Sequence, residues 1–388
     1  MQRVVVAGIG ETRMGKHPDL TLRDLIQDAG TKAIADSGLD KSMIQALYMS
    51  NFNAQFLCHQ GHLGALASEV LGLGTIPTLR TEAACASGSI AFRQAVMAIQ
   101  AGFYDVVLVG GVEKMTHRET ESVTTGIASA ADFNLEGSLG ITFPSIFAMI
   151  ANRYAYEYTD PREAMTACAV QNHDNGLLNP DAQMRKKVTA EQVKGGFPVA
   201  SPLTVFDCSL VTDGAAFVML SRLDVAKAHA RHRLVEVVGS GHAGDTLTAA
   251  SKGSLTTLAA TVRAASDAYK MAGLTPGDID LAEVHDCFTI TQILNGEDLG
   301  FFEKGHGPRA VLDGQTARDG RIPINVSGGL KAKGHPIGAT GLSQVFEVVT
   351  QIRGEAGERQ VKNAEIGLNH NLGGTAATCL VNIFQGVA

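Results

Sequence analysis

Two halves of this 388-residue sequence resemble each other, and this internal repeat restricts the fold more than any other feature. The run at 3–10, Arg-Val-Val-Val-Ala-Gly-Ile-Gly, is similar to Leu-Val-Glu-Val-Val-Gly-Ser-Gly at 234–241. A Gly-Leu pair with an isoleucine five residues after the leucine recurs at Gly38 and Gly273. The matched glycines of the runs and of the Gly-Leu pairs stand 231 and 235 residues apart, as short loop insertions would produce. Chance similarity of βαβ units is the alternative, and duplication explains the pattern better.

The first 112 residues alternate predicted strands and helices. Apolar β-rich runs predict strands at 3–7, 44–49 and 105–111, and helical periodicity predicts helices at 21–37, 56–73 and from about 85 onward. Thr21 is the expected N-cap of the first helix, and Gly38 is its expected C′ residue. The βαβαβ order predicts a parallel sheet with helices packed on it.

The pattern of the chain divides it into three parts. From 113 to 202, polar loops alternate with short helices, which predicts an inserted loop subdomain. We expect an N-terminal half formed by 1–112 and 203–225, and a C-terminal half formed by 226–388. The turn before one predicted helix, Cys85-Ala-Ser-Gly, has a counterpart in Gly338-Ala-Thr-Gly before another. The two halves are therefore expected to face each other about a pseudo-twofold axis, with these loops meeting between them.

Composition excludes several classes of protein. Hydrophobic residues make up 45% and charged residues 18%, and the net charge of −7 argues against a nucleic-acid partner. No apolar stretch approaches the roughly 20 residues of a membrane helix, and the run at 3–7 resembles a first strand more than a signal segment. The six cysteines form no Cys-x-x-Cys pair, so no metal site is predicted. A reducing, cytoplasmic setting is expected.

A cysteine in a run of small residues is the first candidate for chemistry. Thr-Glu-Ala-Ala-Cys-Ala-Ser-Gly-Ser occupies 81–89, and apolar residues at helical spacing follow over 90–99. The pattern predicts an extended segment, a tight turn and a helix that begins at or beside Cys85. A thiol at a helix start lies near unpaired amides and the positive dipole end, and both favour the thiolate. The motif alone is equally compatible with a buried cysteine in a small-residue turn.

Two further stretches predict site residues. His285, Asp286 and Cys287 follow the predicted strand 279–284, at the strand end where open α/β sheets bind ligands. A glycine-rich stretch at 325–341 holds His335 before Pro336 and just ahead of a predicted helix. The alternatives are a structural His-Asp pair in the first stretch and a surface histidine in the second. Buried His, Asp and Cys in succession, and the density of Gly, His and Pro, favour function.

A third stretch, Asn-His-Asn-Leu-Gly-Gly at 369–374, lies between two predicted strands. The glycine pair, Gly373 and Gly374, can offer unhindered backbone amides to an oxyanion. Gly-Gly turns are common, so this motif is weak when taken alone.

Taken together, these motifs resemble those of the thiolase family. The small-residue turn around Cys85, the Gly-His-Pro-Ile-Gly loop at 334–338 and the Gly373–Gly374 pair occur in that order across a duplicated α/β chain. The resemblance implies two βαβαβαββ halves packed in αβαβα layers, with an inserted loop domain. The stretch His285-Asp-Cys287-Phe is similar to the sterol-carrier-protein-2-type branch, whereas other thiolases carry Asn-Glu-Ala-Phe there.

The resemblance implies an activity and a set of partners. The activity is thiolysis of 3-oxoacyl-CoA, or the reverse Claisen condensation of acyl-CoA. Coenzyme A is then substrate and product, and no cofactor is bound permanently. The family implies a homodimer or homotetramer, and this branch includes enzymes with a small OB-fold/zinc-ribbon partner that binds acyl-CoA.

The resemblance also implies site roles. Cys85 is the nucleophile, His335 its base, His285 an anchor of the enolate oxyanion site, and the amides of Cys85 and Gly373 form the second oxyanion hole. In other thiolases a second cysteine stands where this chain has Asn371, which cannot act as acid or base. The resemblance therefore assigns that proton shuttle to Cys287. Four residues are expected near the substrate: Asn371, His370, Gly338 and Ser327.

Three other functions remain open on the sequence. A ketoacyl synthase shares the fold and the nucleophile but needs a second site histidine, which His370 could supply, and its histidine loop usually lacks a proline like Pro336. A retro-aldolase of the same superfamily is a second alternative, against which the Cys85–His335 pair argues. The third is a thiolase-like scaffold subunit that needs a partner.

Overall fold

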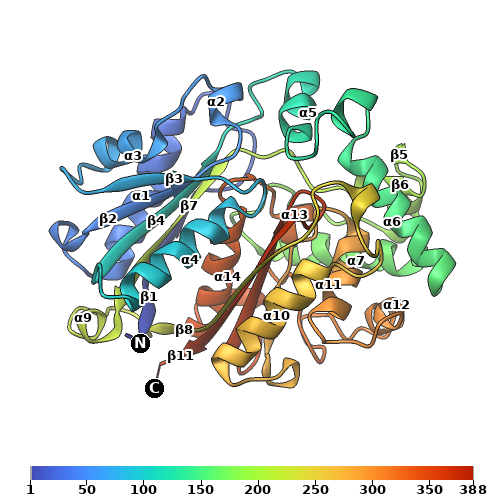
Figure 1. Cartoon of the computed structure of the whole chain (residues 1–388). Helices are drawn as coiled ribbons and strands as arrows, with labels where there is room; N and C mark the ends of the chain where they lie inside the picture. The colour runs from blue at the N-terminus through green and yellow to red at the C-terminus, as the bar shows by residue number, and fades with distance from the viewer. Residues whose placement is uncertain (1, 388) are drawn as a thin grey trace.

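One mixed sheet runs through both halves of the chain in the computed structural model, which describes residues 2–387 (Figure 1). The nine strands lie in the order β3-β2-β4-β7-β1-β8-β11-β10-β9. Their bounds are β1 Val4–Glu11, β2 Ala46–Ser50, β3 Thr78–Thr81, β4 Val106–Glu113, β7 Gly214–Arg222, β8 Val235–Gly244, β9 Leu281–Glu283, β10 Ile366–Gly373 and β11 Thr378–Gly386. Within residues 2–387, the strands of the first half pair with those of the second through Val5–Glu236 and Val6–Val235.

The two halves share one topology, which confirms the predicted duplication. In each half the first strand pairs antiparallel with the last, β1 with β7 and β8 with β11. The last strand then pairs antiparallel with the preceding one, and that strand pairs parallel with the second. The first half adds β3 parallel to β2, and the second half has a parallel bridge from Ala282 to Ile324 at the same place.

The strands predicted within the first 112 residues run in one direction, as expected, but the sheet as a whole is mixed, because the last strand of each half runs against both of its neighbours. In the second half the cause is local: β10 and β11 are joined by a short turn, and a tight hairpin makes antiparallel strands. A parallel pair needs a long crossover, which the helices supply between β2 and its parallel neighbours β3 and β4.

Helices cover both outer faces of the sheet and fill the space between the halves. The helices α1 (Leu22–Ser37) and α3 (Leu63–Leu71) pack on the first half, and α10 (Ala259–Ala272) packs on the second. The helices α4 (Ser87–Gln100) and α14 (Thr340–Arg353) share one hydrophobic core with strands of both halves, so they form the middle layer (Figure 1). This is the αβαβα arrangement expected from the sequence.

The first helix forms as predicted. Thr21 is its N-cap, and its hydroxyl accepts from the Asp24 amide while Asp24 accepts from the Thr21 amide. Gly38 ends it in the left-handed conformation, with φ of 70°. The helix predicted at 56–73 is instead two helices, α2 (Ala54–Leu57) and α3. Residues His59 and His62 between them have φ of 55° and 51°, and left-handed residues interrupt the ladder of helical hydrogen bonds.

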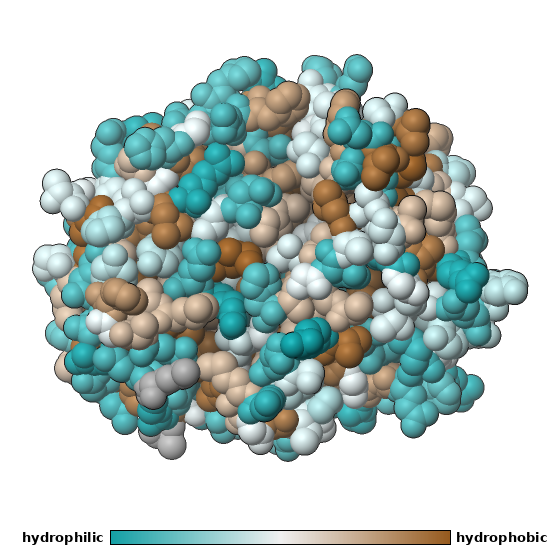
Figure 2. All heavy atoms as spheres, in the orientation of Figure 1, coloured by the Kyte–Doolittle hydropathy of each residue, from teal (hydrophilic) through white to brown (hydrophobic). Residues whose placement is uncertain are grey.

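Helices α5 to α8 lie in the region from 113 to 202, α9 joins the two halves, and α11 to α13 lie between β9 and β10 of the second half. Their bounds are α5 Thr120–Ala128, α6 Phe143–Glu157, α7 Arg162–Leu178, α8 Ala190–Lys194, α9 Leu223–Lys227, α11 Thr289–Asp298, α12 Gly307–Leu312 and α13 Gly329–Ala332, with a small hairpin of β5 Pro198–Ala200 and β6 Leu203–Thr204. None of the helices within residues 2–387 is long and apolar enough to cross a membrane. Polar residues cover much of the face in Figure 2, with apolar residues gathered near α5 and α6.

Two equivalent glycines let the middle helices start side by side. A Cβ on Gly88 of α4 would lie 3.2 Å from the carbonyl oxygen of Gly338 and from the amide nitrogen of Gly341. A Cβ on Gly341 of α14 would lie 2.6 Å from the amide nitrogen of Ser89. A residue with a side chain at either position would separate the two helix starts. The close crossing therefore brings the turn around Cys85 against the loop that carries His335.

Candidate active site

A cavity of about 200 Å³ lies where the two halves meet the region 113–202. Four predicted residues line it together: Cys85, His285, Cys287 and His335. The remaining wall is mostly apolar, and much of it comes from α5, from the start of α6 and from Leu210, Val211, Phe288 and Ile337. The structure therefore joins, in one cavity, residues that are separated by as much as 250 positions in the chain.

Cys85 lies two residues before the first residue of α4, and a backbone amide from the other half contacts its sulfur. The amide of Gly374 is a hydrogen-bond partner of the thiol and helps to stabilise a thiolate. Burial outweighs this effect and raises the pKa of Cys85 to about 12. The thiol is therefore protonated at rest despite its place at a helix start, because apolar neighbours such as Phe52, Met115 and Ile337 displace the water that would solvate the charge.

His335 is held in one orientation and one tautomer. Its amide donates to Thr212 Oγ1 at 2.9 Å, and its Nδ1 lies 2.7 Å from Thr340 Oγ1. The Thr340 hydroxyl donates its proton to the Pro336 carbonyl at 3.1 Å, so its oxygen accepts from Nδ1–H. Nε2 is then left with a free lone pair. Burial lowers the pKa of His335 to about 3, so the ring is neutral at rest.

His285 follows β9, and its ring meets that of His335 edge to face. The ring centroids are 5.1 Å apart at 84°. The Nδ2 amide group of Asn371 lies 3.0 Å from His285 Nδ1, so Nδ1 accepts and the ring proton is on Nε2. This Nε2 is buried and has no hydrogen-bond partner among the residues that the structure describes. Burial lowers the pKa of His285 well below its usual value, so a neutral N–H donor is available to the cavity.

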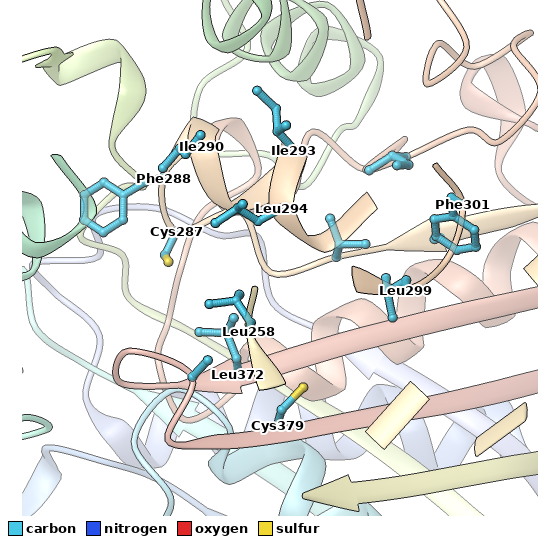
Figure 3. Close-up of a cluster of buried hydrophobic side chains, with 14 of the residues drawn as sticks. Leu258, Cys287, Phe288, Ile290, Ile293, Leu294, Leu299, Phe301, Leu372 and Cys379 are labelled. Atoms are coloured by element: carbon cyan, nitrogen blue, oxygen red, sulfur yellow. The ribbon is translucent and has the colours of Figure 1, made fainter. Parts of the chain in front are cut away.

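Cys287 lies just before α11, among the apolar side chains of the second half (Figure 3). Its Sγ is 3.8 Å from the hydroxyl of Thr291. Burial raises the pKa of Cys287 well above its usual value, and the nearby Cys85 raises it further. The thiol is therefore protonated at rest.

Glu113 is a site residue that the sequence reasoning missed. Its buried carboxylate accepts hydrogen bonds from Asn51 Nδ2 at 2.9 Å and from the amides of Phe52 and Asn53 at 3.0 Å. It also accepts from the amide of Gly338 at 2.9 Å. One carboxylate thus ties strand β4 and the segment after β2 to the loop of His335. The sequence did contain a signal for this residue: Glu113 is an acidic residue at the end of a buried apolar strand, where polar side chains often reach a ligand site.

The remaining predicted residues lie behind the cavity wall. His370 is fully buried in β10, with Nε2 3.0 Å from Thr261 Oγ1, and it does not line the cavity. Ser327 donates to Glu283 at 2.6 Å and faces a separate small recess. Asn371 contacts His285, and Gly338 contacts Glu113, so both act through another residue. Strand pleating puts alternate residues of β10 on opposite faces, which the motif alone did not reveal.

The two glycines, Gly373 and Gly374, differ in which cavities they line. Gly374, with φ of 61°, lines the cavity with Cys85, whereas both glycines line a wider adjoining cavity. A Cβ at Gly373 would lie 2.3 Å from the carbonyl oxygen of Ala83. Gly373 therefore permits the close approach of β10 to the Cys85 turn, and Gly374 presents its amide to the sulfur.

A duplicated α/β chain with a cysteine, two neutral histidines and a second thiol in one cavity defines an enzyme of acyl-transfer chemistry. Residues 4–224 match the family described as thiolase, N-terminal domain, and residues 241–386 match the thiolase C-terminal domain-like family. The chain belongs to the thiolase family. It is an acyltransferase of the thiolase type, as the sequence predicted.

Curated relatives cover the full chain. It is 49% identical over 385 residues to an acetyl-CoA acetyltransferase of Methanothermobacter thermautotrophicus, spanning 99% of this chain and all of that protein. It is 33% identical over 386 residues to sterol carrier protein 2 of Gallus gallus, spanning 96% of this chain and 70% of that protein. A solved structure titled Ltp2-ChsH2(DUF35) aldolase superposes with a TM-score of 0.85 at 23% identity, covering 98% and 97% of the two chains, which shows a shared fold.

Proposed function

We propose that this chain interconverts 3-oxoacyl-CoA plus CoA with two acyl-CoA molecules, through an acyl-enzyme on Cys85. The observation that carries the proposal is that Cys85, His335, His285 and Cys287 line one mainly apolar cavity. In this proposal CoA is substrate and product, and the chemistry requires no permanently bound cofactor. The 49% identity to a relative named acetyl-CoA acetyltransferase supports acyl-CoA as the substrate class.

In the first step the Cys85 thiol attacks the C3 carbonyl, and His335 Nε2 takes its proton. The amides of Cys85 and Gly374 are placed to hold the tetrahedral oxyanion, a role in which each donor typically contributes about 2.7–4 kcal/mol. The sequence-based proposal used Gly373, and the contact of Gly374 with the sulfur favours Gly374 instead. The C2–C3 bond then breaks, which leaves the acyl group on sulfur and an enolate of the departing acyl-CoA.

In the second step the enolate is stabilised and protonated. The donors to the enolate oxygen are His285 Nε2–H and protonated His335. Asn371 keeps the His285 proton on Nε2 because its amide group donates to Nδ1. Cys287, protonated at rest, transfers its proton to the carbanion and becomes a thiolate. That thiolate then removes the proton of an incoming CoA thiol, and CoA attacks the Cys85 thioester. His335 returns the first proton to Cys85, and both thiols end as they began.

The region from 113 to 202 is proposed as the loop subdomain that shapes the acyl pocket, between halves formed by 1–112 with 203–225 and by 226–388. Much of the apolar wall belongs to α5 and α6, which supports this role. Assembly as a homodimer or homotetramer and a cytoplasmic location in lipid metabolism are also proposed. All six cysteines are unpaired in the structure, which supports a reducing compartment.

A small OB-fold/zinc-ribbon partner is proposed as an associate of this chain. The solved aldolase of the same fold includes a DUF35 component in its title, which motivates the idea. Exposed apolar side chains between α5 and α6, Phe133 at 68% and Leu139 at 72%, offer it a surface near the cavity.

The decisive assay uses the purified chain alone with acetoacetyl-CoA and CoA. We expect release of acetyl-CoA, with an acetyl adduct on Cys85 detected by mass spectrometry of the quenched enzyme. Decarboxylation of malonyl-CoA in its place would indicate a ketoacyl synthase. Aldehyde or ketone release from a 3-hydroxyacyl-CoA would indicate a retro-aldolase. Activity only after a partner is added would indicate a scaffold-type subunit.

The rate of Cys85 acylation is expected to change less than about threefold between pH 5 and pH 9. Burial lowers the pKa of His335 to about 3 and raises the pKa of Cys85 to about 12, so neither group titrates in this interval. The neutral pair is the reactive form, and on the acid side it is lost when His335 is protonated near pH 3. Rapid-quench mass spectrometry with subsaturating acetyl-CoA measures the rate. A tenfold rise between pH 5 and pH 8 would show that a group titrates there and would contradict the neutral pair.

A further inference from the structure

Three side chains of the cavity form a ligand set for a thiophilic metal ion. The ligand atoms of Cys85, His285 and His335 all lie within 4.8 Å of one another, and no other group of three metal-ligating side chains this close occurs among residues 2–387. A thiolate with two imidazoles suits Zn²⁺ and similar cations. We propose that these three residues bind Zn²⁺ reversibly and that the bound ion inhibits the enzyme by occupying the nucleophile. The inhibition rests on the proposed function, whereas the binding does not.

The surroundings are built for coordination. Among the described residues, the buried His285 Nε2 has no hydrogen-bond partner, so binding the ion there breaks no hydrogen bond of the protein. His335 Nε2 carries a free lone pair, because Thr340 holds the proton on Nδ1. Metal-binding histidines are usually oriented by such a partner on the other ring nitrogen. With Zn–S of about 2.3 Å and Zn–N of about 2.0–2.1 Å, the three atoms need to move inward only modestly, and water takes the fourth position.

Binding of the ion releases one proton from Cys85 and shifts another within His285. Cys85 loses its thiol proton to solvent and forms the Zn–S bond, and His335 binds as the neutral ring. In His285 the proton moves from Nε2 to Nδ1, where it needs an acceptor. Asn371 Oδ1 is buried and has no partner, so rotation of the amide places it opposite Nδ1–H. One proton is therefore released for each ion bound. As long as the pH is below the pKa of the thiol, the apparent affinity rises about tenfold for each unit by which the pH increases.

Asn371→Asp separates this proposal from a merely structural effect. The carboxylate accepts only, so it holds the His285 proton on Nδ1 and leaves Nε2 as a ligand. Zn²⁺ binding should strengthen by about tenfold or more. Turnover of the metal-free enzyme should fall, because Nε2 no longer donates a proton to the enolate oxygen. A variant that was only damaged would lose both properties.

The experiment titrates the purified chain with Co²⁺ and records thiolate-to-cobalt charge-transfer absorption, then displaces Co²⁺ with Zn²⁺. The wild-type chain and Cys58→Ser should show the band, Cys85→Ser should lack it, and calorimetry in two buffers should find one proton released. Circular dichroism checks the fold of each variant. A missing band in the wild-type chain, a band retained in Cys85→Ser, or weaker binding in Asn371→Asp would overturn the proposal. Acylation of metal-free enzyme by acetyl-CoA, measured in parallel, shows whether the proposed function fails separately.

Discussion

The Cys85→Ser variant is expected to lose the acyl-enzyme, with thiolysis of acetoacetyl-CoA falling by a factor on the order of 10⁴ or more. A hydroxyl is far less acidic and less nucleophilic than a thiol, and the proposed base, His335, is a histidine whose pKa burial has lowered to about 3. The oxyanion donors and the substrate cavity are retained, so substrate binding should survive. Mass spectrometry after incubation with acetyl-CoA should find no adduct.

Cys58→Ser is the matched control for this prediction. Cys58 packs in the same small apolar cluster as Cys85, and its thiol donates a hydrogen bond to the carbonyl oxygen of Lys114 at 3.4 Å, outside the cavity. Its replacement should leave the adduct and the rate within about threefold. Persistent acylation of Cys85→Ser at any residue would place the nucleophile elsewhere and would remove the basis of the mechanism.

The Cys287→Ala variant should still accept an acetyl group on Cys85 but should lose about 10²- to 10⁴-fold in complete thiolysis. Attack by Cys85 requires only His335 and the oxyanion donors. Protonation of the carbanion, and removal of the CoA proton, require the second thiol. Two measurements separate the steps: the burst of acetyl adduct, and exchange of the C2 hydrogens of acetyl-CoA for deuterium, which should be lost.

Cys379→Ala controls for the loss of a buried sulfur. Cys379 lies in β11 within the same hydrophobic core as Cys287 but points elsewhere and does not line the cavity (Figure 3). Its removal should cost stability without removing a proton donor, so deuterium exchange should continue. Unchanged turnover in Cys287→Ala would show that another group, or water, moves the proton, and that the second thiol is not used.

Local patterns made much of the fold predictable. Strands such as β4 are short apolar runs, and α1 combines a helical apolar face with Thr21 at one end and Gly38 at the other. These signals depend on neighbours in sequence, so one chain is enough to detect them. The prediction failed at 56–73, where His59 and His62 adopt left-handed backbone that their residue type does not announce.

The duplication, the family and the four residues that meet in the cavity were predictable from sequence, because each of the four follows a strand end or precedes a helix in a recognisable motif. The protonation of these residues, their hydrogen-bond partners and the close approach at Gly88 and Gly341 depend on tertiary packing. A helix start favours the thiolate of Cys85, whereas burial by residues distant in sequence keeps the thiol protonated. Desolvation and hydrogen-bond partners such as Glu113 and Asn371 depend on which distant segments pack together, and local sequence carries no record of that packing.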